Sequence, residues 1–339
     1  MALAQPARGD PDCPDADTAT MPAMPDATVC NPGDPVVGAW GFRSYREHLA
    51  DRFPGIRVRK LCLHAGFTCP NLDGTRGLGG CAYCDNRAFA PGVDRRRDLA
   101  RQWDDGRHWL RRRHRRVDGF IAYFQSFSNT YGDPAELATL YDQVPDWDEC
   151  LGISLGTRPD CLDDAVLDYL EDLGRRTFLT VEIGLQSDRD AVLERINRGH
   201  DVALFTDTVR RSAGRGFELC VHLMLGLPGE GDDAPERLGA LAASLPIASV
   251  KLHNLHIVRD TALAREFHQG LIREPTRANY LDGARRFLAC LRPDQAVQRI
   301  IADAPPHLLL GAPWCRDKQG FLADVRTAVD SERELVAPV

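Results

Sequence analysis

The hydrophobic pattern along most of the chain alternates between the period of a strand and the period of a helix. Six short runs rich in apolar and β-branched residues each predict a strand. They span residues 60–65, 119–124, 150–155, 177–183, 218–225 and 249–253. Strands separated by helices predict an α/β fold with a parallel sheet and right-handed crossovers. The pattern alone leaves two architectures open, a closed or partial barrel and an open doubly wound sheet.

The helical segments between these runs have recognisable ends. Asp133 followed by Pro134 predicts a helix start, because aspartate caps free backbone N–H groups and proline suits the first turn. Asp160 is expected to cap the next helix, and Gly174 to end it. Two further helices are predicted to begin at Ser187 and Asp201.

The two ends of the chain lack this pattern. Residues 1–36 hold seven prolines among small and acidic residues, and they contain too few apolar side chains to offset the entropy of ordering. We therefore expect a disordered tail at 1–36, one folded core with a C-terminal extension at 37–322, and a C-terminal tail at 323–339.

The formal net charge of −7 argues against binding nucleic acid through overall charge, although it does not exclude a local basic surface. The sequence has no run of about 18 apolar residues that would predict a membrane segment. Residues 1–6 lack the charged and apolar stretches of a secretory signal. We expect a cytoplasmic protein with no membrane partner.

Eleven cysteines are present, and three of them gather in one glycine-rich segment. This segment, residues 60–89, is KLCLHAGFTCPNLDGTRGLGGCAYCDNRAF, and it places Cys69, Cys81 and Cys84 in a Cys-x11-Cys-x2-Cys spacing after a predicted strand. Clustered cysteines in a reducing compartment more often bind metal than form disulfides. Glycines allow a loop positive φ angles and a close approach to a metal centre. Those of this loop are Gly74, Gly77, Gly79 and Gly80.

The number of thiolates bears on the kind of metal. Structural zinc normally takes four ligands, whereas an iron–sulfur cube held by three cysteines leaves one iron open. Cys62 or His64 could supply a fourth ligand, but both alternate with leucines in a strand, where packing is the usual role. We therefore favour an iron–sulfur cluster over zinc. A thiol redox motif at Cys81 and Cys84 fits less well, because it gives Cys69 no role.

The cysteine loop, AGFTCPNLDGTRGLGGCAYC, resembles the cluster loop of a bacterial group of the radical S-adenosylmethionine (SAM) superfamily, the YhcC-like group related to the elongator catalytic subunit. Its spacing is longer than the Cys-x3-Cys-x2-Cys of most of the superfamily and is similar to that of this group. Further segments resemble the group in the same order, over roughly residues 40–314. They are YFQSFSNTY (123–131), LGTRPD (155–160), VEIGLQS (181–187), HLMLGLPGE (222–230), KLHNLHIVRDTALA (251–264) and RIIADAP (299–305).

The resemblance implies a partial (β/α)6 barrel of the TIM-like type. It also implies that Cys69, Cys81 and Cys84 hold a [4Fe–4S] cluster, with SAM bound at the open iron. Reductive cleavage of SAM would yield a deoxyadenosyl radical that acts on an unidentified substrate. An external flavodoxin or ferredoxin would supply the electron.

Polar residues at strand ends are the candidates for binding SAM, because the active sites of barrels gather there. In the resemblance, Tyr83 corresponds to the aromatic residue that usually lies by the adenine. The other candidates are Gln125, Asn129, Arg158, Glu182 and Gln186. For each of them the alternative is a structural hydrogen-bonding role. His222 and His253 are expected to be core histidines.

A basic segment, Arg95 to Arg116, combines ten arginines with Trp103 and Trp109. Arginine and aromatic side chains together can bind RNA through phosphates and stacking, and the relation to elongator makes tRNA a candidate partner. We favour instead a solvated helix on the outside of the barrel, with both tryptophans packed inward. The main alternative to a radical SAM enzyme is a zinc-binding, RNA-associated protein that uses the cysteine loop structurally.

Overall fold

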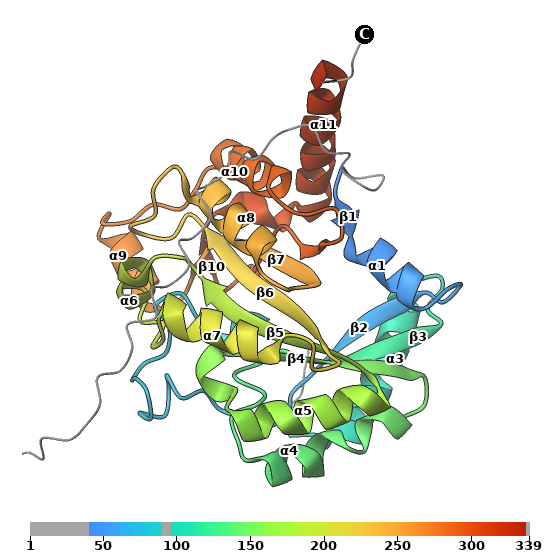
Figure 1. Cartoon of the computed structure of the whole chain (residues 1–339). Helices are drawn as coiled ribbons and strands as arrows, with labels where there is room; N and C mark the ends of the chain where they lie inside the picture. Colours follow the sequence, from blue (N-terminus) through green and yellow to red (C-terminus); the bar gives the residue numbers. More distant parts are fainter. Residues whose placement is uncertain (1–40, 90–95, 337–339) are drawn as a thin grey trace, which may run out of the picture.

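The computed structural model describes residues 41–89 and 96–336, and its central feature is one eight-stranded sheet (Figure 1). The predicted tail at residues 1–36 lies outside the described residues, as does Arg95. The strands of the sheet are β1 (Arg43–Ser44), β2 (Val58–Leu63), β3 (Gly119–Phe124), β4 (Cys150–Thr157), β5 (Phe178–Gln186), β6 (Glu218–Leu225), β7 (Ser249–Asn254) and β9 (Ala296–Arg299). A separate antiparallel pair joins β8 (Ile257–Val258) and β10 (Leu309–Gly311).

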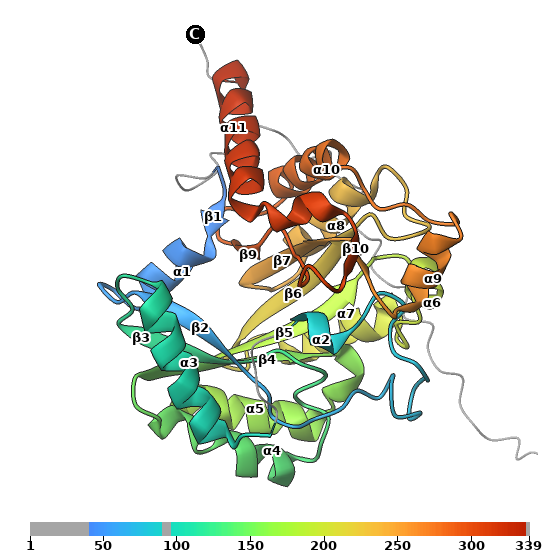
Figure 2. The same ribbon diagram turned by 180° about the vertical axis from the view of Figure 1, so that it is seen from behind.

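The order of the strands distinguishes a barrel from a doubly wound sheet. From β2 to β7, each strand pairs in parallel with the next one in sequence. Because right-handed crossovers that progress in one direction keep their helices on one face, the sheet curls around its other face. Figures 1 and 2 show most of the helices outside this curled sheet. β1 and β2 form its two edges among the described residues, so the predicted partial barrel is confirmed.

The six predicted strands correspond to β2 through β7, with slightly different ends. The strands β1 and β9 were not predicted, because runs of two and four residues are too short to show a period. β9 pairs in parallel with β7, and β1 pairs with β9. The sheet therefore extends beyond the six strands of the barrel core.

Helices connect the strands, and most of them lie on the convex side of the sheet (Figure 1). They are α1 (Tyr45–Arg52), α2 (Asn86–Phe89), α3 (Leu99–Arg113), α4 (Pro134–Tyr141), α5 (Asp164–Arg176), α6 (Asp190–Arg195), α7 (Val202–Ser212), α8 (Ala234–Ser244), α9 (Ala262–His268), α10 (Arg277–Ala289) and α11 (Lys318–Val336). The predicted C-terminal tail at 323–339 falls within α11 as far as Val336, and Val325 is buried. Within residues 41–89 and 96–336, none of the helices combines the length and the apolar character that a bilayer-spanning segment needs.

Of the four predicted helix starts, two are confirmed and two are wrong. Asp133 caps α4 and Asp201 caps α7, each through its side chain. The start predicted at Asp160 is wrong, because Asp163 caps α5 instead. Asp160 uses both carboxylate oxygens to bind Arg158, at 2.8 and 2.9 Å, so its side chain is not free to cap a helix.

Two further helix boundaries differ from prediction. α6 begins after Arg189 rather than at Ser187, whose hydroxyl donates to Glu230. α5 continues past Gly174 and ends at Arg176. Gly174 does not end the helix but allows the chain at Gly216 to pack closely against it. A Cβ at Gly174 would lie 3.1 Å from the carbonyl oxygen of Gly216.

Strand β2 shows how the chain separates an apolar outer layer from a polar interior. Leu61 and Leu63 are buried in the main hydrophobic core. α3 packs directly over this strand, since a Cβ at Gly106 would lie 2.7 Å from the Leu61 side chain. Because alternate residues of a strand face opposite sides, Lys60 points into the barrel, where its ammonium donates to Gln298 of β9 at 2.7 Å.

The two tryptophans of α3 lie in different environments. Trp103 is buried, as predicted, and its indole N–H donates to the Asp148 carbonyl at 3.2 Å. Trp109 is 50% exposed, with the Arg113 guanidinium over its ring at 5.0 Å. The prediction that both tryptophans pack inward is therefore correct for Trp103 and wrong for Trp109.

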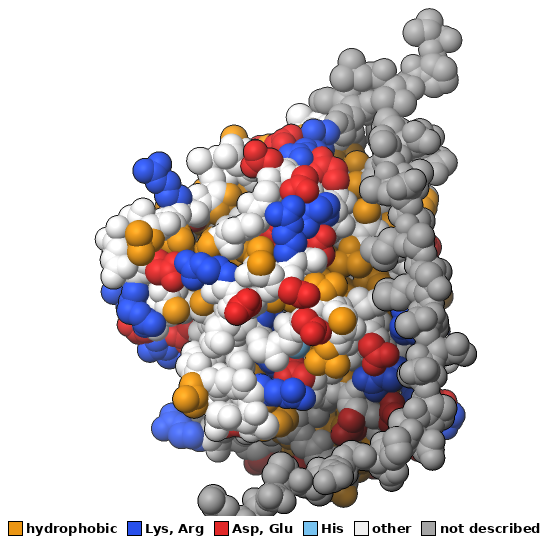
Figure 3. All heavy atoms as spheres, turned by 60° about the vertical axis from the view of Figure 1, so that its left-hand side comes forward, with side chains coloured by type: hydrophobic (Ala, Val, Ile, Leu, Met, Phe, Trp, Pro, Cys, Tyr) orange, Lys and Arg blue, Asp and Glu red, His pale blue; other side chains and the backbone are white. Residues whose placement is uncertain are grey.

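Carboxylates neutralise several arginines of the basic segment. Arg107 donates to Asp148 at 2.7 Å and to Glu149 at 2.8 Å, and Arg111 also pairs with Glu149. Arg97 pairs with Asp105. Basic and acidic side chains are likewise interspersed on the face of the molecule drawn in Figure 3. These pairings fit the interpretation of α3 as a solvated outer helix.

Replacing Trp103 with alanine is expected to lower the free energy of unfolding by about 3–5 kcal/mol, the usual loss when a large buried aromatic side chain is truncated. Trp109→Ala, on the same helix, is the matched control and should change it by about 0.5 kcal/mol or less. Urea unfolding followed by circular dichroism measures both. Equal losses for the two variants would contradict the packing described for α3.

Candidate functional site

A cavity of about 410 Å³ lies at the carboxyl ends of the strands, beside the loop that joins β2 to α2. Cys69, Cys81 and Cys84 all line it. The carboxyl ends of parallel strands are where the active sites of barrels gather. This cavity is therefore the candidate site.

Glycines shape the cysteine loop as predicted. Positive φ angles, which glycine adopts without strain, occur at Gly74, Gly79 and Gly80. At Gly77 a Cβ would lie 2.5 Å from the amide oxygen of Asn71, so the close approach requires glycine. Asn71 is fully buried and donates its amide N–H to the sulfur of Cys81 at 3.6 Å. The loop backbone thus positions a hydrogen-bond donor against one of the cysteines.

Other donors also reach the cysteine sulfurs. The guanidinium of Arg198 donates to Cys81 Sγ at 3.4 Å, and the hydroxyl of Ser128 donates to Cys69 Sγ at 3.7 Å. Burial raises the pKa of the Cys81 thiol, but the guanidinium groups of Arg198 and Arg158 outweigh it and hold the pKa below its ordinary value. These surroundings favour the thiolate, which is the form that binds metal.

Cys84 shows that the three thiols share one site. Burial raises the pKa of the Cys84 thiol, and the neighbouring Cys81 and Cys69 raise it further. A thiolate disfavours the ionisation of a thiol beside it, because the two charges would be alike. A positively charged metal centre between them would reverse this effect.

Five of the six residues predicted to contact SAM line the same cavity as the cysteines. They are Tyr83, Gln125, Arg158, Glu182 and Gln186. Asn129 is not among the lining residues. Its amide donates to the backbone carbonyls of Phe124, Ser126 and Gly156 at 2.9, 3.1 and 2.9 Å, so it holds the loop after β3 in place.

Gln186 and Arg158 both present features suited to a ligand. Gln186 ends β5 with a φ of +85°, a strained value for a residue other than glycine. A Cβ at Gly184 would lie 2.6 Å from the amide nitrogen of Gln186 and 2.6 Å from a guanidinium nitrogen of Arg198, so glycine leaves room for both side chains. Arg158 is held by Asp160, while its Nη1 is buried without a partner among the described residues.

Glu182 lies at the floor of the cavity, and its fully buried carboxylate is the centre of an interior network. The donors to it are Lys60, Ser154, Tyr123 and His222, at 2.5, 2.9, 2.8 and 2.9 Å, together with Lys251. Burial raises the pKa of Glu182, but Lys251 and Lys60 outweigh it and hold the pKa well below its ordinary value. Because both oxygens already accept several hydrogen bonds, the structural role predicted as the alternative for Glu182 fits better than contact with SAM.

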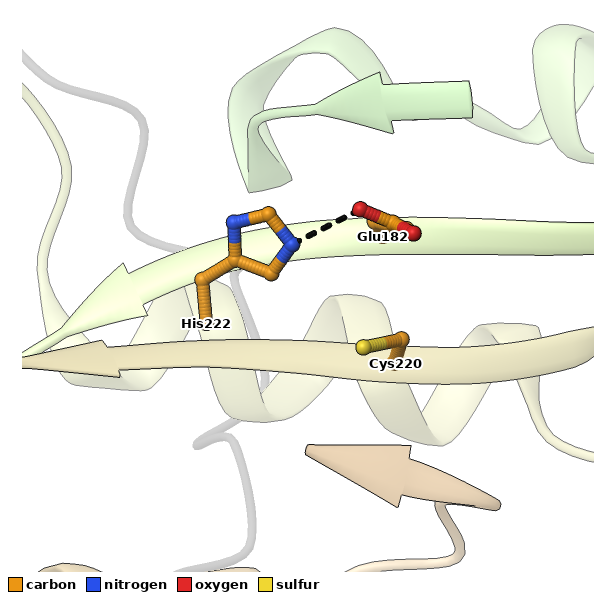
Figure 4. Close-up of side chains that lie close together, drawn as sticks. All are labelled: Glu182, Cys220 and His222. Carbon is orange, nitrogen blue, oxygen red and sulfur yellow. Dashed lines mark hydrogen bonds and ion pairs between the residues drawn. The ribbon is translucent and has the colours of Figure 1, made fainter. Parts of the chain in front are cut away.

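Glu182, Cys220 and His222 also bring their ligand atoms within 4.8 Å of one another, and Figure 4 shows the imidazole directed at the carboxylate. Two ammonium groups already bind this carboxylate and would repel a metal cation. Burial raises the pKa of the Cys220 thiol to about 12, so the thiolate that a metal needs is disfavoured. We therefore interpret this group as part of the interior network rather than a metal site.

Several residues of the site were not predicted from the sequence. Asn71 stands two positions after Cys69, and its place in the cysteine loop was the signal that could have revealed it. Arg198 follows α6 and lies 117 positions from Cys81, so no local pattern links the two. Lys60 and Lys251 were hidden for the same reason, because the contacts that explain them cross the barrel.

Comparison with known families defines the class of protein. Residues 75–242 match the radical SAM superfamily, and residues 247–330 match the Radical_SAM C-terminal domain. The chain belongs to the radical SAM superfamily. The predicted radical SAM enzyme is therefore confirmed at the level of the superfamily.

Individual relatives show which group of the superfamily the chain is similar to in sequence. Protein YhcC of Escherichia coli K12 is 36% identical over 267 residues, which are 78% of this chain and 84% of that protein. YtqA of Bacillus subtilis is 32% identical over 292 residues, 86% of this chain and 90% of that protein. Elongator complex protein 3 of Schizosaccharomyces pombe is 29% identical over 165 residues, 48% of this chain and 30% of that protein. The predicted YhcC-like group with its relation to the elongator subunit is confirmed.

A solved structure shares the fold. The archaeal Elp3 of Methanocaldococcus infernus with an N-terminal deletion (1–46) aligns with a TM-score of 0.58 and 15% sequence identity. The alignment covers 83% of this chain and 63% of that one, so this chain spans less than two thirds of the archaeal protein. At this level of identity the likeness concerns the fold.

Replacing Glu182 with glutamine is expected to lower the free energy of unfolding by about 3–5 kcal/mol, because two buried ammonium groups lose their carboxylate. Lowering the pH should also destabilise the chain, because it protonates the same carboxylate. The pKa of Glu182 is lower in the folded chain than the unfolded value of about 4.3, so its contribution is complete above that pH and is lost as the pH falls below it. Urea unfolding between pH 7 and pH 3 should show a steeper loss for the wild type than for Glu182→Gln.

The control for this experiment is Glu194→Gln, which changes an exposed carboxylate and should keep the wild-type pH profile. If the wild type and Glu182→Gln lost stability in parallel on acidification, Glu182 would not be the ionised centre of the interior network.

Proposed function

We propose that this chain binds a [4Fe–4S] cluster through Cys69, Cys81 and Cys84, and that SAM binds at the iron left open by these three ligands. Reductive cleavage of SAM then yields a deoxyadenosyl radical, which abstracts hydrogen from an unidentified substrate. The observation that carries the proposal is that three cysteines of one loop line the cavity at the carboxyl ends of the barrel strands in a member of the radical SAM superfamily.

The chemistry of the donor set supports a cluster over a single zinc ion. Among the described residues, the three sulfur atoms do not form a group whose ligand atoms all lie within 4.8 Å of one another. Zinc–sulfur bonds of about 2.3 Å would hold tetrahedral sulfur ligands closer together than this. Cys62 and His64, the two residues considered as a fourth ligand for zinc, are not among the residues that line the cavity with the three cysteines. The cysteine loop therefore favours the larger centre.

When bound, the cluster supplies the electron that cleaves SAM. The chain's own side chains then have the task of binding and orienting SAM. We assign this to Tyr83, Gln125, Arg158 and Gln186, which line the cavity with the cysteines. The amides of Gln125 and Gln186 suit the polar groups of SAM, and the ring of Tyr83 suits the adenine.

A small redox protein of the flavodoxin or ferredoxin type is the proposed source of the electron. For RNA, no specific contact adds support to the sequence-based prediction, because Arg107 and Arg111 of the basic segment are already paired with carboxylates. The RNA partner stays a prediction, and the substrate is sought first among molecules that fit the cavity.

Electron paramagnetic resonance on anaerobically reconstituted, dithionite-reduced protein tests the proposal. We expect a reduced-cluster signal whose shape changes when SAM is added, because SAM binds the open iron. Replacing Cys69, Cys81 or Cys84 with alanine should abolish both the signal and the iron content of the chain.

Cys161→Ala and Cys290→Ala are the controls and should keep the wild-type iron content, because neither thiol lines the cavity. Cys161 is the stricter control, since its thiol lies close enough to Cys69 to feel its charge. Full iron content in the triple variant of Cys69, Cys81 and Cys84, or zinc in place of iron in the wild type, would disprove the cluster assignment.

Arg198→Met tests the surroundings of the cluster separately from its ligands. The variant removes a buried positive charge and a donor to the sulfur of Cys81, so reduction of the cluster should become less favourable. We expect the reduction potential to fall by about 60 mV, the equivalent of a tenfold change for one electron. A redox titration followed by electron paramagnetic resonance measures the shift, with Arg195→Met on the exposed side of α6 as the control.

A further inference from the structure

Strand β9 contributes an arginine to the interior of the barrel. The register between β7 and β9 shifts after Val250, so that Lys251 pairs with Arg299 and Gln298 is left as the extra residue of a bulge. Gln298 accepts a hydrogen bond from Lys60 inside the barrel. The charge of Arg299 acts on interior groups of three other strands, Cys62, Tyr123 and His222. Both residues at the bulge are therefore directed inward.

Arg299 makes no hydrogen bond or ion pair with any residue that the structure describes, although it is partly buried. Arg299 is not itself among the lining residues of the cavity, but its charge acts on His253 and His256, which are. Two arginines that do line the cavity are held, Arg158 by Asp160 and Arg198 by the sulfur of Cys81 and the carbonyl of Gly184. A guanidinium that is partly withdrawn from water favours a nearby anion. No nitrogen of Arg299 is among the fully buried atoms that lack a partner, so its guanidinium is accessible to a ligand.

Two histidines near Arg299 each have one buried ring nitrogen without a hydrogen bond in the described part of the chain. His253 and His256 both line the cavity, and the Nε2 of each is buried without a hydrogen bond. The Nδ1 of His256 donates to the carbonyl of Asn254 at 3.2 Å, so its Nε2 accepts a hydrogen from a ligand when the ring is neutral. No bond fixes the tautomer of His253, and its Nε2 is able to donate. These nitrogens are a second sign, independent of Arg299, that the wall binds something.

The charges of the interior favour an anion. Lys60 and Lys251 bind the single carboxylate of Glu182, and Arg299 adds a third positive charge close enough to act on Lys251. Burial lowers the pKa of Lys251 to about 8, which still leaves it mainly cationic at neutral pH. Burial also lowers the pKa of His222 to about 4, so this imidazole is neutral and does not add to the excess. One carboxylate against three cations gives the interior an excess of positive charge, which an anionic ligand would neutralise.

We propose that Arg299, His253 and His256 form a subsite for an oxyanion, a carboxylate or a phosphate, carried by the substrate. The proposal rests on the proposed function, since it places the substrate in the cavity that the three cysteines line. Arg299 and His253 donate to the anionic oxygens, and His256 accepts from a hydroxyl or N–H of the same group or its neighbour. A cationic substrate group is excluded at this wall by Lys251 and Arg299.

Calorimetric titration of the cluster-reconstituted protein, kept without oxygen and saturated with SAM, tests the subsite. The probes are inorganic phosphate and acetate, each measured against sodium chloride at the same ionic strength. We expect at least one probe to bind the wild type at least tenfold more tightly than Arg299→Met. Tighter binding of phosphate indicates a phosphate-bearing substrate, and tighter binding of acetate indicates a carboxylate-bearing one.

Arg273→Met, at an exposed arginine outside the barrel, is the matched control and should bind the probe as the wild type does. His253→Phe removes a donor without changing the charge, and it should also weaken binding if Arg299→Met fails to fold. Equal affinity in the wild type and both interior variants overturns the proposal, as does the absence of probe binding. Probe binding that SAM abolishes overturns it too, because the subsite would then belong to SAM.

Failure of the proposed function gives a different result. A reconstituted protein without iron would disprove the cluster, while titration of the same protein would still show whether Arg299 binds an oxyanion. Normal iron content with probe binding that is insensitive to Arg299→Met and His253→Phe would disprove the subsite alone.

Discussion

The carboxylate of Glu182 is the interaction on which the interior of this barrel depends. It lies on β5, in the middle of the sheet, and accepts hydrogen bonds from side chains of β2, β3, β4, β6 and β7. Lys60 extends the connection, since its ammonium also donates to Gln298 of β9. A closed barrel is held in shape by backbone hydrogen bonds around its whole circumference. In this open sheet, side-chain bonds across the concave face connect strands that the backbone does not.

This polar interior explains why a cavity exists below the cysteine loop. The centre of a closed barrel is filled by layers of branched apolar side chains. Here the ammonium groups of Lys60 and Lys251 lie 4.8 and 4.3 Å from the centre of the Tyr123 ring, and both bind Glu182. Buried charges persist only where they are paired in this way. The apolar packing is instead found outside the sheet, where Leu61 and Leu63 lie in the main hydrophobic core.

The sequence predicted those features that depend on neighbouring residues. The six strands followed from local periodicity, and the metal loop followed from three cysteines within sixteen positions, Cys69 to Cys84. The interior network was beyond such reasoning, because Lys60 and Glu182 are 122 positions apart and only the register of the sheet brings them together. The cap predicted at Asp160 failed for a related reason. Asp160 and Asp163 are both acceptable caps by sequence, and the choice depends on Arg158, which holds the former.

The two ends of the cavity differ in what they offer a ligand. At the mouth, Arg198 and Asn71 direct their hydrogens at the sulfur of Cys81, so these donors are already engaged. At the floor, the donors of the interior network converge on Glu182, whereas Arg299 lies outside the network without a partner among the described residues. Near the cysteines, the Nη1 of Arg158 has no partner among the described residues and is the nitrogen available to SAM, whereas Arg299 is the cation available further into the barrel. In the proposed function, SAM and a substrate oxyanion would occupy separate ends of one cavity, so that neither displaces the other.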